Sequence, residues 1–143
     1  MLHVGFTGTR QGMTDSQKSG LIALFELIGR KNLINAILHH GDCVGADAEA
    51  DDIISLYGGN VVIHPPTATQ YRAFKNQEES RPKGLANVIE VHKPSAYLVR
   101  DRRIVDSCRL LIAAPKSFVE TGGTWYTINY AKRERRSVLI LNP

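Results

Sequence analysis

The N-terminal stretch reads Leu2-His3-Val4-Gly5-Phe6-Thr7-Gly8-Thr9-Arg10, an apolar run that ends in glycine, threonine and arginine. Residues 2–7 have the length and composition of a buried strand. A helix is expected after Thr14, because Thr14 and Gln17 have the spacing of a capping box. The apolar residues that follow recur on one helical face: Leu21, Leu24, Phe25 and Ile28. A strand, a glycine turn and a helix in this order are typical of α/β folds.

The rest of the chain repeats this alternation of short apolar runs and helical patterns. Candidate strands lie at 2–7, 34–39, 60–64, 88–92, 110–114 and 138–141. Further helices are expected after Gly45, ending at Gly58-Gly59, and over 95–107 and 124–135. Because several strands are apolar throughout, both faces of the sheet should be covered. The sequence therefore predicts one α/β domain over residues 1–143, a Rossmann-like three-layer fold with a mostly parallel sheet and helices on both faces.

The segment 65–84 departs from the pattern because it is polar and interrupted by prolines. A short helix is expected around 69–79, with loops on either side. The segment is interpreted either as a lid or as a contact between subunits, and periodicity does not distinguish these.

Composition and charge restrict the classes of function. The two cysteines, Cys43 and Cys108, lack the spacing of metal ligands and indicate a reducing compartment. No apolar run approaches the roughly 20 residues of a membrane span, and Met1 leads directly into the first strand instead of a secretory leader. A cytoplasmic protein without a membrane partner, cofactor or metal is expected. The net charge of +4 favours an anionic partner.

Glycine-rich segments follow the first and the fifth candidate strands. Gly8-Thr9-Arg10 supplies backbone amides, a hydroxyl and a guanidinium at the end of the first strand. Gly122-Gly123-Thr124 precedes the last helix, where free amides and the helix dipole attract phosphate. Neither segment has a GxGxxG pattern or a P-loop ending, so ATP hydrolysis of the Walker type is not expected. Both segments are predicted to bind an anion at the carboxyl edge of the sheet, although tight turns alone also explain glycines.

The segment Gly41-Asp42-Cys43-Val44-Gly45-Ala46-Asp47 follows the second strand. Asp42 is a candidate acceptor for sugar hydroxyls or a base edge. Asp47 either contacts the same ligand or, with the acids that follow it, interacts with the helix dipole and solvent. A metal site of His39, His40 and Cys43 is disfavoured because adjacent strand residues point to opposite faces. Cys43 lacks an obvious activating partner for a role as nucleophile.

Arg100 and Trp125 lie on the third and fourth expected helices. Helical arginines are mostly surface residues, but one that turns inward presents a planar fork suited to phosphate or carboxylate. Arg100 is therefore a candidate ligand-binding residue. Trp125 has helical spacing with Ile128 and Ala131, which favours core packing over stacking on a base.

Taken in order, these four segments resemble the SLOG superfamily of Rossmann-like nucleotide-ligand domains. The superfamily includes the Lonely-Guy phosphoribohydrolases, the DNA-processing protein A family and molybdenum-cofactor carrier proteins. The resemblance rests on residues 5–10, 41–47 and 100–113 and on Gly122-Gly123-Thr124, and it spans nearly the whole chain. It implies a nucleotide-derived ligand with its phosphate at the glycine turns, a homo-oligomer, and a bacterial or phage origin. The chain departs from the Lonely-Guy motif PGGxGTxxE because no carboxylate follows Thr124 closely. It also has Arg100-Asp101 where many relatives have Arg-Asn.

Three functions are compatible with these residues. The first is binding, as sensing or sequestration, of a phosphate-bearing nucleotide-derived molecule by Gly8, Thr9, Arg10, Gly41, Asp42, Gly45, Asp47, Arg100, Gly122, Gly123 and Thr124. The second is hydrolysis or transfer at an N-glycosidic bond, which needs a carboxylate near the anomeric carbon, with Asp42, Asp47 or Glu120 as candidates. The third is nucleic-acid binding of the DNA-processing protein A kind, through clusters that a solvated helix face also explains: Arg100, Arg102, Arg103, Lys132, Arg133, Arg135 and Arg136.

Overall fold

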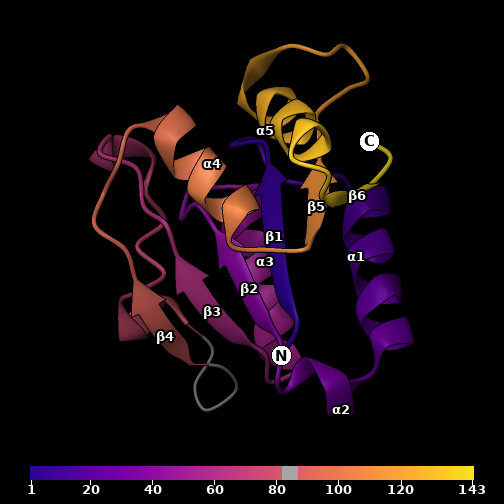
Figure 1. Cartoon of the computed structure of the whole chain (residues 1–143). Coiled ribbons are helices and arrows are strands. Elements are labelled where there is room, and N and C mark those ends of the chain that lie inside the picture. The colour runs from indigo at the N-terminus through magenta and orange to yellow at the C-terminus, as the bar shows by residue number, and fades with distance from the viewer. Residues whose placement is uncertain (82–86) are drawn as a thin grey trace.

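The computed structural model describes residues 1–81 and 87–143, which form a six-stranded sheet (Figure 1). The strands are β1 (His3–Gly8), β2 (Ile37–His40), β3 (Asn60–Ile63), β4 (Val88–Val91), β5 (Leu110–Ala114) and β6 (Ser137–Ile140). Their order is β4-β3-β2-β1-β5-β6, and every neighbouring pair is parallel. From β1 the chain adds strands outward to β4, and it then returns to place β5 and β6 on the other side of β1. The strand order therefore reverses between β1 and β5, which makes this the topological switch point of the sheet.

Helices cover both faces of the sheet, which confirms the predicted α/β three-layer fold (Figure 1). On one face, α1 (Asp15–Ile28) and α3 (Ala46–Leu56) pack their apolar sides on β1, β2 and β3, in a core that includes Phe6, Leu21, Phe25, Leu38, Ile54 and Ile63. On the other face, α4 (Tyr97–Asp106) and α5 (Gly122–Arg133) pack on β5 through Ile104, Leu111, Ala113, Trp125, Ile128 and Ala131. Within residues 1–81 and 87–143, no helix is long and apolar enough to cross a membrane.

The predicted start of α1 is confirmed, whereas the starts of β2 and α5 differ from prediction. Gln17 N donates to Thr14 Oγ1 at 3.1 Å and Thr14 N donates to Gln17 Oε1 at 3.0 Å, which completes the capping box. β2 begins at Ile37 instead of residue 34, because a short helix, α2 (Arg30–Leu33), uses the amide of Ile34 to close its turn. α5 begins at Gly122, so the two glycines form its first turn and do not precede it.

The helix predicted over 69–79 is wrong. The segment forms two short 3₁₀ turns, η1 (Thr69–Tyr71) and η2 (Glu78–Ser80), joined by irregular chain. Residues 82–84 of the predicted excursion lie outside the described residues. Polar side chains fix this segment to the rest of the molecule.

Three acids that follow β2 hold this segment. Arg72 Nε donates to Asp42 Oδ2 at 2.9 Å, Lys75 Nζ to Asp52 Oδ1 at 2.7 Å and Arg81 Nη1 to Asp51 Oδ1 at 2.7 Å. The side chains of Asp42 and Asp51 are fully buried. Asp51 therefore does not act as a solvated charge near a helix N-terminus, which was one of its predicted roles. The carboxylate of Asp42 is paired with protein groups instead of the predicted ligand. Below, these contacts of Asp42, Asp51 and Asp52 are called the acid clamp.

A row of histidines crosses the sheet from β1 to the end of β4. His3 Nδ1 lies 2.9 Å from His39 Nε2, and His39 Nδ1 lies 3.0 Å from His64 Nε2. The rings of His64 and His92 stack, with centroids 4.3 Å apart. His39 and His64 are 5% and 1% exposed. Burial, followed by the charge of neighbouring histidines, lowers the pKa of His39 to about 4 and that of His64 to about 3. The central rings of the row are therefore neutral in the folded protein near pH 7.

The histidine row predicts that the protein loses stability as the pH falls below 6.5. Above that pH, both the folded and the unfolded chain leave His39 and His64 neutral. Below it, the unfolded chain binds protons that the folded row does not bind until about pH 4. Each extra proton on the unfolded chain lowers the free energy of unfolding by about 1.4 kcal/mol per pH unit.

Urea unfolding at pH 7.5, 6.0 and 5.0 measures this slope. As a control, the double variant His39→Gln/His64→Gln should be less stable at pH 7.5 but should show a flatter dependence on pH. Equal slopes in the two proteins would exclude the row as the source of acid sensitivity.

The acid clamp predicts a structural role for Asp42. In Asp42→Ala, Arg72 and the amide of Lys75 lose a fully buried acceptor, and breaking such a pair lowers the free energy of unfolding by about 3 kcal/mol. Chemical denaturation measures the change. The matched control is Glu120→Ala, which removes an exposed carboxylate and should alter stability by less than about 0.5 kcal/mol. A similar small effect for Asp42→Ala would contradict the clamp.

Candidate functional site

The carboxyl ends of the strands surround an open cavity of about 500 Å³, beside the point between β1 and β5 where the strand order reverses. Ligands of open parallel sheets bind at such a point. The lining comes from the turns after β1, β2 and β5 and from α3, α4 and α5. It includes nine of the eleven residues predicted to bind a ligand: Gly8, Thr9, Arg10, Gly41, Asp47, Arg100, Gly122, Gly123 and Thr124. Asp42 and Gly45 are the two that lie outside it.

The turn after β1 packs directly on the start of α3. A Cβ on Gly8 would lie 2.5 Å from the Cβ of Ala46, so no larger residue fits there. Gly45 has a φ of +91°, and a Cβ on it would overlap the carbonyl of Arg10. The amide of Ala46 donates to the carbonyl oxygen of Thr9 at 3.0 Å, which fixes the turn. Gly45 therefore supports the turn that lines the cavity.

The N-terminus of α5 opens onto the same cavity. Thr121 precedes the helix but its side chain makes no capping hydrogen bond. Among the described residues, no atom lies within 4 Å of the position that a Cβ would take on Gly122 or Gly123. The first amides of a helix have no partner within the helix, so the first turn of this 12-residue helix offers donors to a ligand. Lys116 and Arg10 add two cationic side chains to the lining.

Arg100 turns inward from α4, but its donors are directed at protein groups. Its side chain is 7% exposed. Nε donates to Asp101 Oδ1 at 2.8 Å, and Nη1 donates to the carbonyl oxygens of Gly41 and His64. Both terminal nitrogens also lie within 3.8 Å of Cys43 Sγ. Arg100 therefore lines the cavity as a structural cation that joins α4 to the ends of β2 and β3.

Two buried carboxyl groups, Asp47 and Asp101, lie beside Arg100 in the lining. They are 5% and 7% exposed. Burial raises the pKa of each group, and the charge of Arg100 opposes that rise without cancelling it. The cavity thus has donors at the glycine turns and acceptors next to Arg100.

Of the residues considered for catalysis, some line the cavity and others do not. Burial is the main cause that raises the pKa of the Cys43 thiol to about 11, so the thiol is protonated near pH 7. Asp42 has its carboxylate in the acid clamp, with the amide of Lys75 donating to Oδ1 at 2.9 Å. Glu120 is exposed and is not part of the lining. Asp47 is the candidate catalytic acid that the structure places at the cavity.

His39 and His40 point to opposite faces of the sheet, as strand alternation requires. His39 belongs to the histidine row, whereas His40 Nε2 lies 2.7 Å from Asp51 Oδ2 on the other face. Among the residues that the structure describes, no three His, Cys, Asp or Glu side chains are grouped as metal ligands.

Sequence reasoning missed Tyr97, Asp101 and Lys116 as lining residues. Tyr97 and Asp101 had a usable signal, because with Arg100 they follow helical spacing on one face of α4. Lys116 lies in the irregular segment between β5 and α5, where no periodicity exists. Trp125 packs in the core and also contributes to the lining, and its Nε1 donates to the carbonyl of Ser117 at 2.9 Å.

No protein-family model and no curated protein sequence matches this chain. Solved structures match it in fold. DNA processing protein A from Streptococcus pneumoniae is 18% identical, with a TM-score of 0.70 over 98% of this chain and 50% of that protein. The chain therefore spans half the length of that relative.

Two further structures are similar over most of their own length. The molybdenum cofactor binding protein from Rippkaea orientalis is 19% identical, with a TM-score of 0.68 over 99% of this chain and 77% of that one. The Moco carrier protein from Chlamydomonas reinhardtii is 20% identical, with a TM-score of 0.62 over 98% of this chain and 75% of that one. The chain therefore shares the Rossmann-like α/β fold of these proteins, as its alternation of apolar strands and helices predicted.

Proposed function

We propose that the protein binds a phosphate-bearing, nucleotide-type small molecule in the cavity at the carboxyl edge of the sheet. The observation that carries the proposal is the convergence of two donor-rich segments on one cavity: residues 8–10 after β1 and the uncapped first turn of α5. Amides at a helix N-terminus bind phosphate because the helix dipole and the free N–H groups act together. Arg10 and Lys116 supply positive charge beside them.

The walls of the cavity support a ligand that also has a flat ring. Tyr97, Leu98, Val119 and Trp125 contribute apolar surface to the lining. Aromatic side chains stack on nucleic bases of any sequence, because every base presents a π face. The two neighbours with a molybdenum cofactor in their names, from Rippkaea orientalis and Chlamydomonas reinhardtii, associate this fold with small-molecule binding.

The substitution Gly123→Asp tests the proposal. A Cβ at this position meets no atom of the described residues within 4 Å, and a carboxylate interacts favourably with the helix dipole, so the melting temperature should stay constant or rise. It also repels an anion from the same turn. We expect the affinity for nucleoside monophosphates, measured by isothermal titration calorimetry, to fall at least about 10-fold.

Gly123→Ala is the matched control, since it adds the same Cβ without the charge and should retain affinity within about threefold. The proposal is rejected if no nucleoside mono-, di- or triphosphate binds the wild-type protein. It is also rejected if Gly123→Asp binds as tightly as Gly123→Ala.

A second candidate function is cleavage or transfer at an N-glycosidic bond, favoured by the position of Asp47 in the cavity. A buried carboxyl group with a raised pKa is suited to donate a proton to a departing base. Incubation with nucleoside monophosphates should then release free base, detected by liquid chromatography. Full activity in Asp47→Asn would remove this residue from the mechanism.

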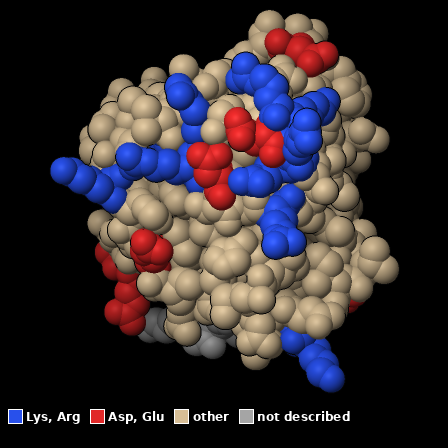
Figure 2. Space-filling model, viewed as in Figure 1, with Lys and Arg blue, Asp and Glu red and all other residues tan. Residues whose placement is uncertain are grey.

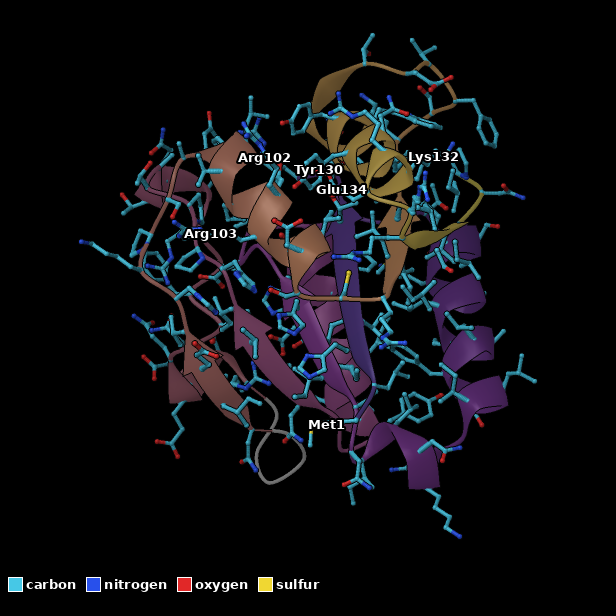
Figure 3. All side chains as sticks on the ribbon, in the orientation of Figure 1. Met1, Arg102, Arg103, Tyr130, Lys132 and Glu134 are labelled. Atoms are coloured by element: carbon cyan, nitrogen blue, oxygen red, sulfur yellow. The ribbon has the colours of Figure 1, made fainter. Side chains whose placement is uncertain are left out.

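A third candidate, nucleic-acid binding, is favoured by the charges on the outer face of α4 and α5, which is the face seen in Figure 2. Lys and Arg side chains gather there, with Asp and Glu among them (Figure 2). Arg102 and Arg103 extend from α4, and Lys132 and Glu134 lie at the end of α5 (Figure 3). Binding through this face should weaken steeply with salt, because phosphate contacts release counterions. Unchanged DNA affinity after charge reversal at Arg133 and Arg136 would exclude it.

A further inference from the structure

The deep part of the cavity contains more negative than positive groups. Asp47 comes from α3, Asp101 comes from α4, and a single guanidinium, that of Arg100, lies beside both. All three side chains belong to residues that are more than nine-tenths buried. An anionic ligand would not place its phosphate next to two carboxylates, so this end of the cavity is suited to another part of the ligand.

Part of the acceptor capacity of these carboxylates is unused, above all at Asp47. Within residues 1–81 and 87–143, Asp47 accepts one hydrogen bond, from the amide of Cys43 to Oδ2 at 3.2 Å. Asp101 accepts from Arg100 Nε to Oδ1 at 2.8 Å, and the hydroxyl of Thr127 on α5 also interacts with its carboxyl group. An ionised carboxylate offers about four lone-pair sites. Buried polar groups are normally paired, so donors from the ligand would fill these sites.

The protein has few donors of its own to offer. The terminal nitrogens of Arg100 are directed at the carbonyl oxygens of Gly41 and His64 and at Cys43 Sγ. The hydroxyl of Tyr97, a residue of the cavity wall, is buried and has no hydrogen-bond partner among the described residues. The unpaired hydroxyl of Tyr97 and the free acceptor sites of the two carboxylates are independent signs that polar groups of a ligand belong in this cavity.

We propose that Asp47 and Asp101 recognise an edge of paired hydrogen-bond donors on a flat heterocycle: an amino group next to a ring N–H, as in guanine. This inference rests on the proposed nucleotide-binding function and specifies its ligand. The two oxygens of a carboxylate accept two adjacent, parallel N–H groups in one plane, the same bidentate geometry that arginine offers to carboxylates. The aromatic walls at Tyr97 and Trp125 favour a ring over a flexible chain of hydroxyls.

The carboxylates would select their ligand because a ligand that lacks a donor leaves a buried acceptor unpaired. A ligand without the amino group would leave a buried carboxylate oxygen without a donor, and such a loss discriminates strongly between similar ligands. The N–H groups of a ligand with the amino group are partly positive, and they compensate the desolvation of the Asp47 and Asp101 carboxylates. Specificity and affinity would therefore come from different groups of the cavity, specificity from the two carboxylates and affinity from the free amides of the first turn of α5.

Calorimetric titration of the wild-type protein with three nucleotides tests the proposal. Inosine monophosphate differs from guanosine monophosphate only by lacking the amino group, and deoxyguanosine monophosphate lacks only a sugar hydroxyl. We expect guanosine and deoxyguanosine monophosphates to bind with similar affinity, and both to bind about 10-fold or more tightly than inosine monophosphate.

Variants assign the effect to the carboxylates. Asp47→Asn and Asp101→Asn, checked for folding by circular dichroism, should each reduce the ratio of guanosine to inosine affinity towards one. Glu134→Gln removes an exposed carboxylate remote from the lining and should leave the ratio unchanged. The wild-type ratio is informative even if a variant does not fold.

Three results would overturn the inference. Equal binding of guanosine and inosine monophosphates would remove the amino group from recognition while leaving the proposed function intact. A loss confined to deoxyguanosine monophosphate would show that the carboxylates contact the sugar instead. If no nucleotide binds, this inference and the proposed function both fail.

Discussion

The cavity depends on the buried guanidinium of Arg100. This side chain comes from α4, yet it donates to the carbonyl oxygens of Gly41, at the end of β2, and of His64, next to β3. A buried arginine is costly unless it is paired and its donors are used, and the neighbouring Asp101 supplies the charge. Gly41 is required for the same contact, because a Cβ on it would overlap Nη1. One ionic group thus fixes the distance between α4 and the sheet, and so the width of the cavity.

The buried acids of the chain divide into two groups with different roles. Asp42 and Asp51 are saturated by Arg72, Arg81, His40 and the amide of Lys75, and they hold the segment 65–81 in place. Asp47 and Asp101 retain free acceptor sites and line the cavity. The difference is one of hydrogen-bond partners and not of burial, since all four residues are buried. Buried carboxylates with full partners stabilise the structure, whereas those without partners are available to a ligand.

Much of the fold was predictable because it follows from apolar runs and from the geometry of parallel sheets. Leu111, Ile112 and Ala113 are fully buried, as a strand covered on both faces must be. The site was predictable for a related reason. Carboxyl ends of parallel strands meet at one edge whatever their distance in sequence, so Gly8 and Gly123 line the same cavity.

Side-chain direction and polar pairing were not predictable from the same signals. Asp42 has a φ of +56°, a local conformation that directs its carboxylate to Arg72 instead of the cavity. No period in the sequence indicates that pairing, because Arg72 lies in an irregular segment. The histidine row is equally hidden, since it requires β1, β2, β3 and β4 to be neighbours in that order, which apolar runs alone do not specify. Polar partners thus depend on the assembled fold, whereas apolar periodicity is a property of each element.

His64 connects the histidine row to the cavity. Its ring contacts His39 and His92, and its carbonyl oxygen accepts from Arg100. Burial is the main cause that lowers the pKa of His64, and the charge of Arg100 acts in the same direction. Arg100 is always protonated in a protein, so the cation that lies beside Asp47 and Asp101 also helps to keep the row neutral. A change that removed the positive charge at Arg100 would leave the Asp47 and Asp101 carboxylates without their cation, and it would also make the histidine row easier to protonate. The cavity and the histidine row are therefore electrostatically linked through Arg100.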